Sequence, residues 1–227
     1  MLPFNVERET FLDWLTYKVQ NPGKRSYAVV LVAENAFGIG RSWVGNILER
    51  AMQGHVSKAN LAQLIGRGTS ADKTYNDWAS QCQFLIVDEA KDVSQEDLYL
   101  VYETFKQRVD TSPAPFWANP KYGNTRNDFM HFNGLIFSNH VDAMTIPEND
   151  RLITVFTNPS KPETTEYYKE QMAALQPESK EPRRVYWYFK RRDVSKFEPA
   201  KRPNDTGQSG HDKSLQVACR GNTGPST

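Results

Sequence analysis

A segment that could bind phosphate lies near the start of the chain, where Glu-Asn-Ala-Phe-Gly-Ile-Gly-Arg-Ser separates an apolar run from a helical pattern. It follows the phosphate-loop pattern G-x-x-x-x-G-K-[ST] at Gly40 and Ser42, while Asn35 replaces the first glycine and Arg41 replaces the lysine. The backbone amides of such a loop, with Gly38 inside it, and the N-terminus of the following helix both favour an anion. These residues therefore predict a site for the phosphates of a nucleotide.

The two departures from the pattern differ in weight. Asparagine tolerates left-handed backbone angles better than most residues, so Asn35 is a mild change. Arginine keeps the charge of the usual lysine, but its planar fork is larger, so Arg41 is not a conservative replacement. We expect triphosphate binding to survive and hydrolysis to be slowed or rearranged. Taken alone, the segment fits an ordinary turn equally well.

A pair of acids follows a second apolar run. Asp88 and Glu89 come directly after Phe84 to Val87, which places them at the carboxyl edge of a sheet, where α/β proteins bind ligands. In phosphate-loop ATPases such an aspartate holds Mg²⁺ and such a glutamate polarises the attacking water. The alternative is a strand that ends in a solvated Asp-Glu turn.

Two further polar residues flank later apolar runs. Asn139 ends the run that begins near Leu135, and a neutral amide there could contact a γ-phosphate or orient a water; a turn asparagine is the alternative. Arg151 precedes the last run and could neutralise charge in the site of a neighbouring subunit. An ion pair with Asp150 on the surface is the alternative for Arg151.

The elements that must position these residues alternate between strands and helices. Apolar, strand-sized runs that do not alternate indicate strands buried on both faces, and they lie at Ala28 to Ala33, Phe84 to Val87, Leu135 to Phe137 and Ile153 to Phe156. Helical patterns lie at 8–20, 43–52, 95–109 and 163–175, whereas 183–190 fits a strand or a helix. This order predicts an α/β fold with a mostly parallel sheet.

The overall composition is that of a globular protein. The 227 residues carry a net charge of +1, so any binding to nucleic acid must use a local patch. Cys82 and Cys219 lie too far apart in the sequence to form a metal-ligand pattern. The sequence contains neither a signal peptide nor an apolar run of about 18 residues. We therefore expect a cytoplasmic protein without membrane contact.

Taken in order, these motifs resemble those of superfamily 3 helicases, and the match is closest to the primase-helicase proteins of phages, prophages and plasmids. The stretch from Trp14 to Arg25 is also similar to the segment that precedes the loop in that family, and the resemblance covers roughly residues 10 to 160. It implies an AAA+-like P-loop NTPase core that binds ATP and Mg²⁺. The family has a second arginine where this chain has Leu152.

The resemblance also assigns roles to the candidate residues. It implies that phosphate is bound by Asn35, Gly38, Gly40, Arg41 and Ser42. It implies that Mg²⁺ is bound by Ser42 and Asp88. The implied catalytic residues are Glu89, Asn139 as the sensor and Arg151 as the arginine finger. It implies a ring-shaped homo-oligomer, a hexamer, that contacts single-stranded DNA through a hairpin. The matching stretch is 117–126, with Lys121 and Arg126 as the DNA contacts; a surface hairpin with solvated charges is the alternative. A primase or polymerase is an expected partner, in the host bacterial cytoplasm if a phage encodes the chain.

The sequence suggests four parts: an N-terminal helical segment (1–27), an ATPase core (28–160), a helical and basic extension (161–198) and a disordered tail (199–227). Between residues 180 and 202, nine cations and three acids give a net charge of +6, interleaved with aromatic residues. That composition suits nucleic acid and equally suits a packed element with a solvated face.

These features favour an ATP-dependent DNA helicase or translocase motor in the replication of a phage or mobile element. One alternative is a degenerate P-loop module that binds nucleotide or DNA as a scaffold or regulator, for which Arg41 and Leu152 are the evidence. Another is a different P-loop class, such as a packaging ATPase or a small-molecule kinase.

Overall fold

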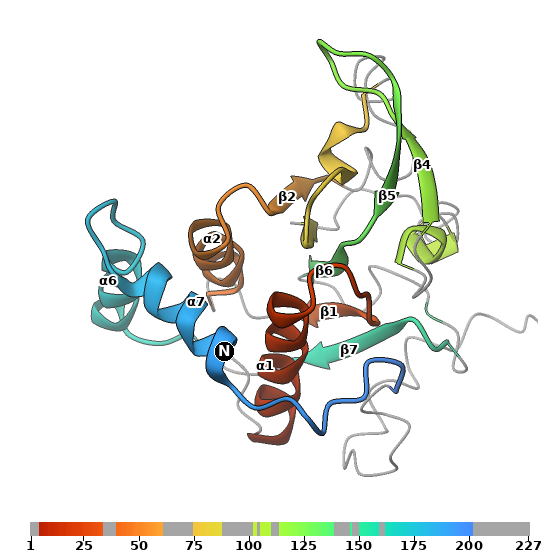
Figure 1. The fold of residues 1–227 in the computed structure, drawn as a ribbon. Coiled ribbons are helices and arrows are strands. Elements are labelled where there is room, and N and C mark those ends of the chain that lie inside the picture. Colours follow the sequence, from red (N-terminus) through yellow and green to blue (C-terminus); the bar gives the residue numbers. More distant parts are fainter. Residues whose placement is uncertain are drawn as a thin grey trace, which may run out of the picture.

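The computed structural model describes residues 5–33, 40–60, 75–87, 102–103, 105–109, 114–138, 146, 150–158 and 162–201. These residues form an α/β structure built on a five-stranded parallel sheet, with a separate two-stranded hairpin (Figure 1). Among them, no helix is both long enough and apolar enough to cross a membrane.

The central sheet confirms the prediction of a parallel α/β fold. Its strands, in spatial order, are β2 (Val56–Ala59), β3 (Phe84–Val87), β6 (Asn133–Ser138), β1 (Ala28–Val32) and β7 (Ile153–Thr157). The four strands expected from apolar runs are present, with bounds within two residues of the predicted ones. The edge strand β2 was not predicted, because its sequence, Val-Ser-Lys-Ala, is short and half polar.

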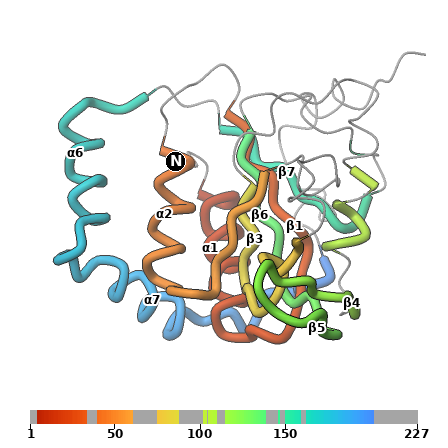
Figure 2. Tube along the Cα trace, turned by 90° about the horizontal axis from the view of Figure 1, so that it is seen from above, coloured from red at the N-terminus to blue at the C-terminus, as the bar shows by residue number. Residues whose placement is uncertain are grey.

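Both faces of the sheet are buried, as the non-alternating apolar runs predict. Val30 and Val32 of β1 belong to one core cluster, which includes Phe105, whereas Val29 and Leu31 belong to the other. The second cluster is completed by the helices α1 (Asn5–Gln20), α2 (Arg41–Ala51) and α7 (Glu181–Arg191). Figure 2 shows α2 between the sheet and the outermost helix, α6 (Thr165–Ala173).

Helix α1 is fixed to the sheet by its aromatic residues and by one buried lysine. Trp14 is fully buried and its indole N–H donates to the carbonyl of Tyr27, just before β1, at 2.7 Å. Lys18 is also fully buried. Its ammonium donates to the carbonyls of Pro22 (2.8 Å) and Lys24 (2.7 Å), and to that of His131.

The hairpin predicted between the second and third apolar runs is present. It consists of β4 (Ala114–Ala118) and β5 (Arg126–Met130), which pair in antiparallel register. Asn76, which precedes the short 3₁₀-helix η1 (Asp77–Ala79), bonds to the main chain of Trp117 and Asn119, where β4 leads into the hairpin loop. The loop beyond these strands projects away from the sheet (Figure 1).

The C-terminal part of the described chain is helical. Residues 183–190, which the sequence left open between strand and helix, lie in α7. Helix α6 confirms the predicted helical pattern at 163–175, and its N-cap, Thr164, accepts a hydrogen bond from the amide of Tyr167. The predicted tail lies outside the described residues from 202 onward.

Candidate functional site

The candidate phosphate loop connects β1 to α2 at the carboxyl edge of the sheet. Gly40 is the N-cap of α2 and has φ 86° and ψ 16°, a left-handed conformation that glycine adopts without steric cost. Further into the helix, a Cβ added at Gly45 would lie 3.3 Å from the side chains of both Ile86 and Phe137. Gly45 therefore lets α2 pack closely on β3 and β6, a role that no sequence pattern had indicated.

The start of α2 has the chemistry of an anion site. The cap residue Gly40 offers no side chain to the first amides of the helix, and the first turn carries no acid. Ser42 lies in that turn and is exposed. Unbonded amides and the positive end of the helix dipole attract an anion, and a hydroxyl beside them can bind a metal ion. Gly40, Arg41 and Ser42 thus lie at the N-terminal start of the helix that follows β1 in the chain, and their role in binding phosphate stays a prediction.

The side chain of Arg41 reaches the neighbouring strand β6. Its guanidinium donates a hydrogen bond to the main-chain carbonyl of Ser138, the last residue of that strand. The same carbonyl accepts a bond from the amide of Ala33, at 3.0 Å. On the other side of β1, the amide of Asn158 donates to the carbonyl of Val32 at 2.7 Å. The carboxyl ends of β6, β1 and β7 are therefore joined directly before the candidate loop.

Five of the predicted site residues lie outside the described part of the chain: Asn35, Gly38, Asp88, Glu89 and Asn139. The strands that lead to them are described. Strand β3 ends at Val87, directly before the acidic pair, and β6 ends at Ser138, directly before Asn139. Because β3 and β6 are parallel neighbours, both run toward the edge at which α2 begins.

Arg151 lies at the amino-terminal end of the parallel strands, opposite the end at which α2 begins. It is exposed, two residues before β7, and no described residue forms an ion pair with it. Because β7 and β1 are in register over five residues, Arg151 is separated from the edge with Gly40 by about 16 Å of strand.

The alternative in which Arg151 pairs with Asp150 is wrong. Asp150 is buried and accepts hydrogen bonds from the hydroxyl of Tyr102 (2.6 Å) and the amides of Leu152 (2.8 Å) and Ile153 (2.7 Å). It therefore fixes the turn into β7 and leaves the neighbouring arginine exposed. An aspartate just before an apolar run is the sequence signal that could have indicated this role.

The hairpin presents a cation and two aromatic rings to solvent. Tyr122 at its tip is 92% exposed and Trp117 is 67% exposed. The ammonium of Lys121 lies 5.4 Å from the centre of the Tyr122 ring. Arg126 is engaged differently, because its guanidinium lies 3.7 Å from the carboxylate of Asp128. Lys121 is thus the more available of the two predicted DNA contacts.

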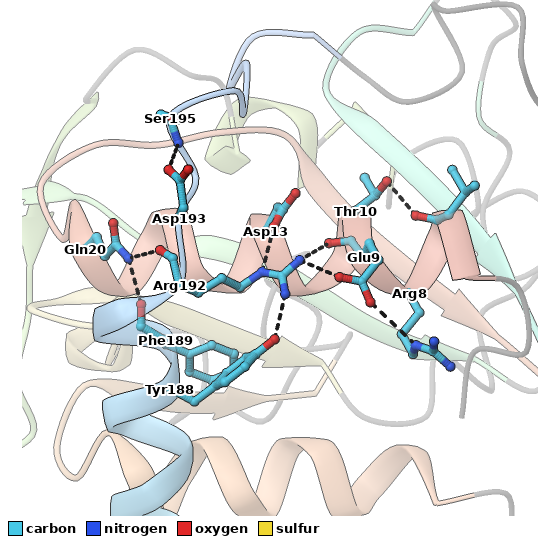
Figure 3. A network of polar contacts seen from close by, with 11 residues as sticks. Arg8, Glu9, Thr10, Asp13, Gln20, Tyr188, Phe189, Arg192, Asp193 and Ser195 are labelled. Carbon is cyan, nitrogen blue, oxygen red and sulfur yellow. Dashed lines mark hydrogen bonds and ion pairs between the residues drawn. The ribbon is translucent and has the colours of Figure 1, made fainter.

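The basic segment after residue 180 is a packed element with a solvated face, the second of the two interpretations of its sequence. Phe189 of α7 is buried in the core cluster with α1 and α2, while the cations of the same helix face solvent. Its orientation is fixed by Arg192, which bonds to Glu9 and Asp13 of α1 at 2.7 Å each (Figure 3). Burial alone would lower the pKa of Arg192, but its hydrogen bonds to the two carboxylates raise it. The segment is therefore a packed helix with a charged outer face.

Comparisons with known proteins support the fold. No protein-family model matches this sequence, and no curated protein matches it. Among solved structures, the apo structure of the NrS-1 C-terminal region (305–718) matches 95% of this chain and 47% of that chain, at 16% identity and a TM-score of 0.71. An A form of the same region matches 95% and 48%, at 18% identity and a TM-score of 0.68. The chain therefore shares its fold with the NrS-1 C-terminal region and spans about half the length of those solved chains.

Proposed function

We propose that the chain is an ATP-dependent motor that moves on single-stranded DNA during replication of a phage or mobile element. The strand order β2-β3-β6-β1-β7 carries this proposal. It directs the candidate loop after β1, the acidic pair after β3 and the asparagine after β6 to one edge of the sheet. Ligands of parallel α/β sheets bind at that edge, and the order of motifs is the one that resembles superfamily 3 helicases.

The residues at this edge fit a Mg²⁺-triphosphate. Asn35, Gly38, Gly40 and Arg41 hold the phosphates, and Ser42 binds the metal ion with Asp88. The left-handed Gly40 and the exposed Ser42 at an uncapped helix start support this assignment. When bound, Mg²⁺ neutralises charge on the β- and γ-phosphate oxygens.

The remaining roles follow from the chemistry of the side chains. Glu89 polarises the attacking water, and the neutral amide of Asn139 orients it or contacts the γ-phosphate. Arg151 acts in the site of a neighbouring subunit, since it lies at the sheet edge remote from its own loop. Because no residue in the described part of the chain forms an ion pair with Arg151, its guanidinium is available to bind a phosphate of a neighbouring subunit's nucleotide. This arrangement requires a homo-oligomer, which we propose to be a hexameric ring.

The hairpin is the proposed contact with DNA. The ammonium of Lys121 supplies charge for a phosphate, and the exposed rings of Tyr122 and Trp117 supply stacking surfaces for unpaired bases. Arg126 has a secondary part because Asp128 already engages it. A primase or polymerase would provide the starting point on DNA, in the host bacterial cytoplasm if a phage encodes the chain.

The deciding experiment is steady-state ATP hydrolysis with and without single-stranded DNA. We expect DNA to stimulate turnover, and Glu89→Gln to lower the stimulated rate by about a hundredfold or more. Ser42→Ala should lose the Mg²⁺-dependent rate as well. Glu178→Gln, which neutralises an exposed acid after α6, serves as the matched control. Tight ATP binding without turnover would instead favour the degenerate scaffold module. A protein that neither binds nor hydrolyses ATP would contradict the proposal.

A further inference from the structure

The outer face of α7 concentrates cations and aromatic rings. Residues 180, 183, 184, 187, 188 and 191 follow the three- and four-residue spacing that places side chains on one face of a helix. With Arg192 they line a shallow hollow of about 820 Å³, and they are Lys180, Arg183, Arg184, Trp187, Tyr188 and Arg191. The face extends over about 16 Å of helix.

The opposite face of α7 is already used by the fold. Pro182 and Phe189 are buried, and Val185 and Tyr186 pack against the core cluster that includes α1 and α2. The helix therefore has no free apolar face for insertion into a lipid surface. What it presents to solvent is charge and aromatic surface.

The face is held in a fixed orientation. Arg192 is bonded to Glu9 and Asp13 of α1, and it also donates to the phenol oxygen of Tyr188 at 2.6 Å. The side-chain amide of Gln20 donates to the carbonyls of Phe189 and Arg192 at the end of α7 (Figure 3). A surface that is ordered before binding loses less conformational entropy when a ligand arrives.

Most of the charge on this face is uncompensated. Of the five cations that line the hollow, Arg184 pairs with Glu181 and Arg192 pairs with Glu9 and Asp13. Lys180, Arg183 and Arg191 are exposed, and none of them forms an ion pair with another residue of the described ranges. An acceptor with several negative charges is the chemical complement of this arrangement.

The aromatic rings narrow the choice of partner. Trp187 and Tyr188 are each 45% exposed, and the guanidinium of Arg191 lies 5.4 Å from the centre of the Trp187 ring. Phosphates alone would need only the cations, whereas large exposed rings beside cations suit unpaired bases that stack on them. An acidic protein surface would satisfy the charges and leave these rings without a matching partner.

We infer that this face of α7 is a second binding surface for single-stranded nucleic acid, separate from the hairpin. Lys180, Arg183 and Arg191 contact phosphates, and Trp187 and Tyr188 stack on bases. Helix α7, which carries this surface, lies apart from β4 and β5 in both views of the fold (Figures 1 and 2). The inference does not depend on ATP hydrolysis, because the surface lacks every residue of the candidate nucleotide site.

The test measures binding of a fluorescent single-stranded oligonucleotide of about 20 nucleotides by anisotropy, without ATP. The protein carries Lys121→Ala, Tyr122→Ala and Trp117→Ala, so that the hairpin contributes little. In this background we expect Arg183→Gln with Arg191→Gln to weaken binding about tenfold at low salt, and to reduce the slope of log affinity against log salt by about 1.4. Trp187→Ala should weaken binding about tenfold by loss of stacking.

The matched control is Lys169→Gln with Lys196→Gln, which removes the same charge from exposed positions outside the hollow. It should change affinity less than twofold. An equal loss in this control and in the α7 double variant would overturn the inference. The inference would also be contradicted if duplex DNA bound as tightly as the single strand and Trp187→Ala had no effect. A third contradicting result would be that polyglutamate competes as well as DNA at equal charge. The last result would favour an acidic protein partner.

Discussion

The guanidinium of Arg41 donates to the main-chain carbonyl of Ser138 and so joins the first residue of α2 to the last residue of β6. Arginine distributes five N–H donors over three nitrogens in a fixed fork. A lysine has three donors on a single nitrogen and no such division. The arginine in this loop therefore has a structural contact that the usual pattern does not explain.

We expect Arg41→Lys to keep ATP affinity within about tenfold of the wild type, because the charge remains at the start of α2. Arg41→Met should weaken ATP binding more than tenfold while lowering stability by only about 1 kcal/mol, since the Ser138 carbonyl keeps its bond to Ala33. Titration with a fluorescent nucleotide and urea unfolding measure the two effects. Unchanged affinity in Arg41→Met would mean that the guanidinium serves only to attach β6.

The position of Arg151 at the sheet edge opposite Gly40 leads to an expectation for mixed oligomers. Arg151→Ala and Glu89→Gln should each bind ATP and lose turnover, the former by about a thousandfold if the arginine stabilises the transition state. When the two variants are mixed, an Arg151→Ala subunit keeps its own Glu89. Its site can receive Arg151 from a neighbouring Glu89→Gln subunit. Turnover of the mixture should therefore exceed that of either variant.

Arg8→Ala, which removes another exposed arginine, is the control and should hydrolyse ATP as the wild type does. If the mixture stays as inactive as its components while both variants form oligomers, Arg151 does not act between subunits.

Lys18 connects three separate parts of the main chain, because its ammonium bonds to the carbonyls of Pro22, Lys24 and His131. We expect Lys18→Met to lower the free energy of unfolding by about 2–4 kcal/mol, since three part-buried main-chain carbonyls would lose the donor that a fully buried side chain provides. Lys24→Met, which alters an exposed side chain, should stay within about 0.5 kcal/mol of the wild type. Urea unfolding measures both, and equal stabilities would show that water replaces the lysine.

The titration of Lys18 gives stability a pH dependence. Burial, and then the charge of Arg25, lower the pKa of Lys18 to about 7, whereas the unfolded side chain titrates near 10.4. Between these values the unfolded chain binds a proton that the folded chain has released, so stability rises with pH. Below about 7 both states hold the proton and this contribution is constant.

The window for measuring this effect is about pH 7 to 8.5. Burial raises the pKa of the Cys82 thiol to about 11, and above about 8.5 this group lowers stability with rising pH. Within the window the stability difference between wild type and Lys18→Met should grow with pH. A difference that stays constant would mean that the folded protein keeps Lys18 charged throughout.

The elements that could be predicted from the sequence are those in which consecutive residues are all apolar because all are buried. The strands β1, β3, β6 and β7 are apolar runs because both their faces are covered, and the loop before α2 follows a known spacing. The contact between Lys18 and His131 could not be predicted, since 113 residues separate its partners. The helix α7 was ambiguous for a related reason: only the packing of Phe189 against other elements decides which of its residues are inside.

The close contact between β6 and the helix at 105–109 depends on Gly134. A Cβ added there would lie 2.5 Å from the ring of Phe105 and 3.2 Å from Val109. Both side chains are buried in the core cluster, and cores that lack space respond to extra volume by strain or backbone shifts. We expect Gly134→Ala to lower the free energy of unfolding by about 1–3 kcal/mol.

Gly23→Ala is the control for this substitution, because a Cβ at Gly23 meets no atom within 4 Å. It should leave stability unchanged or raise it slightly through the unfolded state, by about 0.4–1 kcal/mol. A second variant, Gly134→Ala with Phe105→Leu, should recover part of the loss, since the smaller side chain removes the ring that the new methyl group meets. If Gly134→Ala is as stable as the wild type, Phe105 has room to move, and the helix at 105–109 is packed less tightly on β6 than the structure indicates.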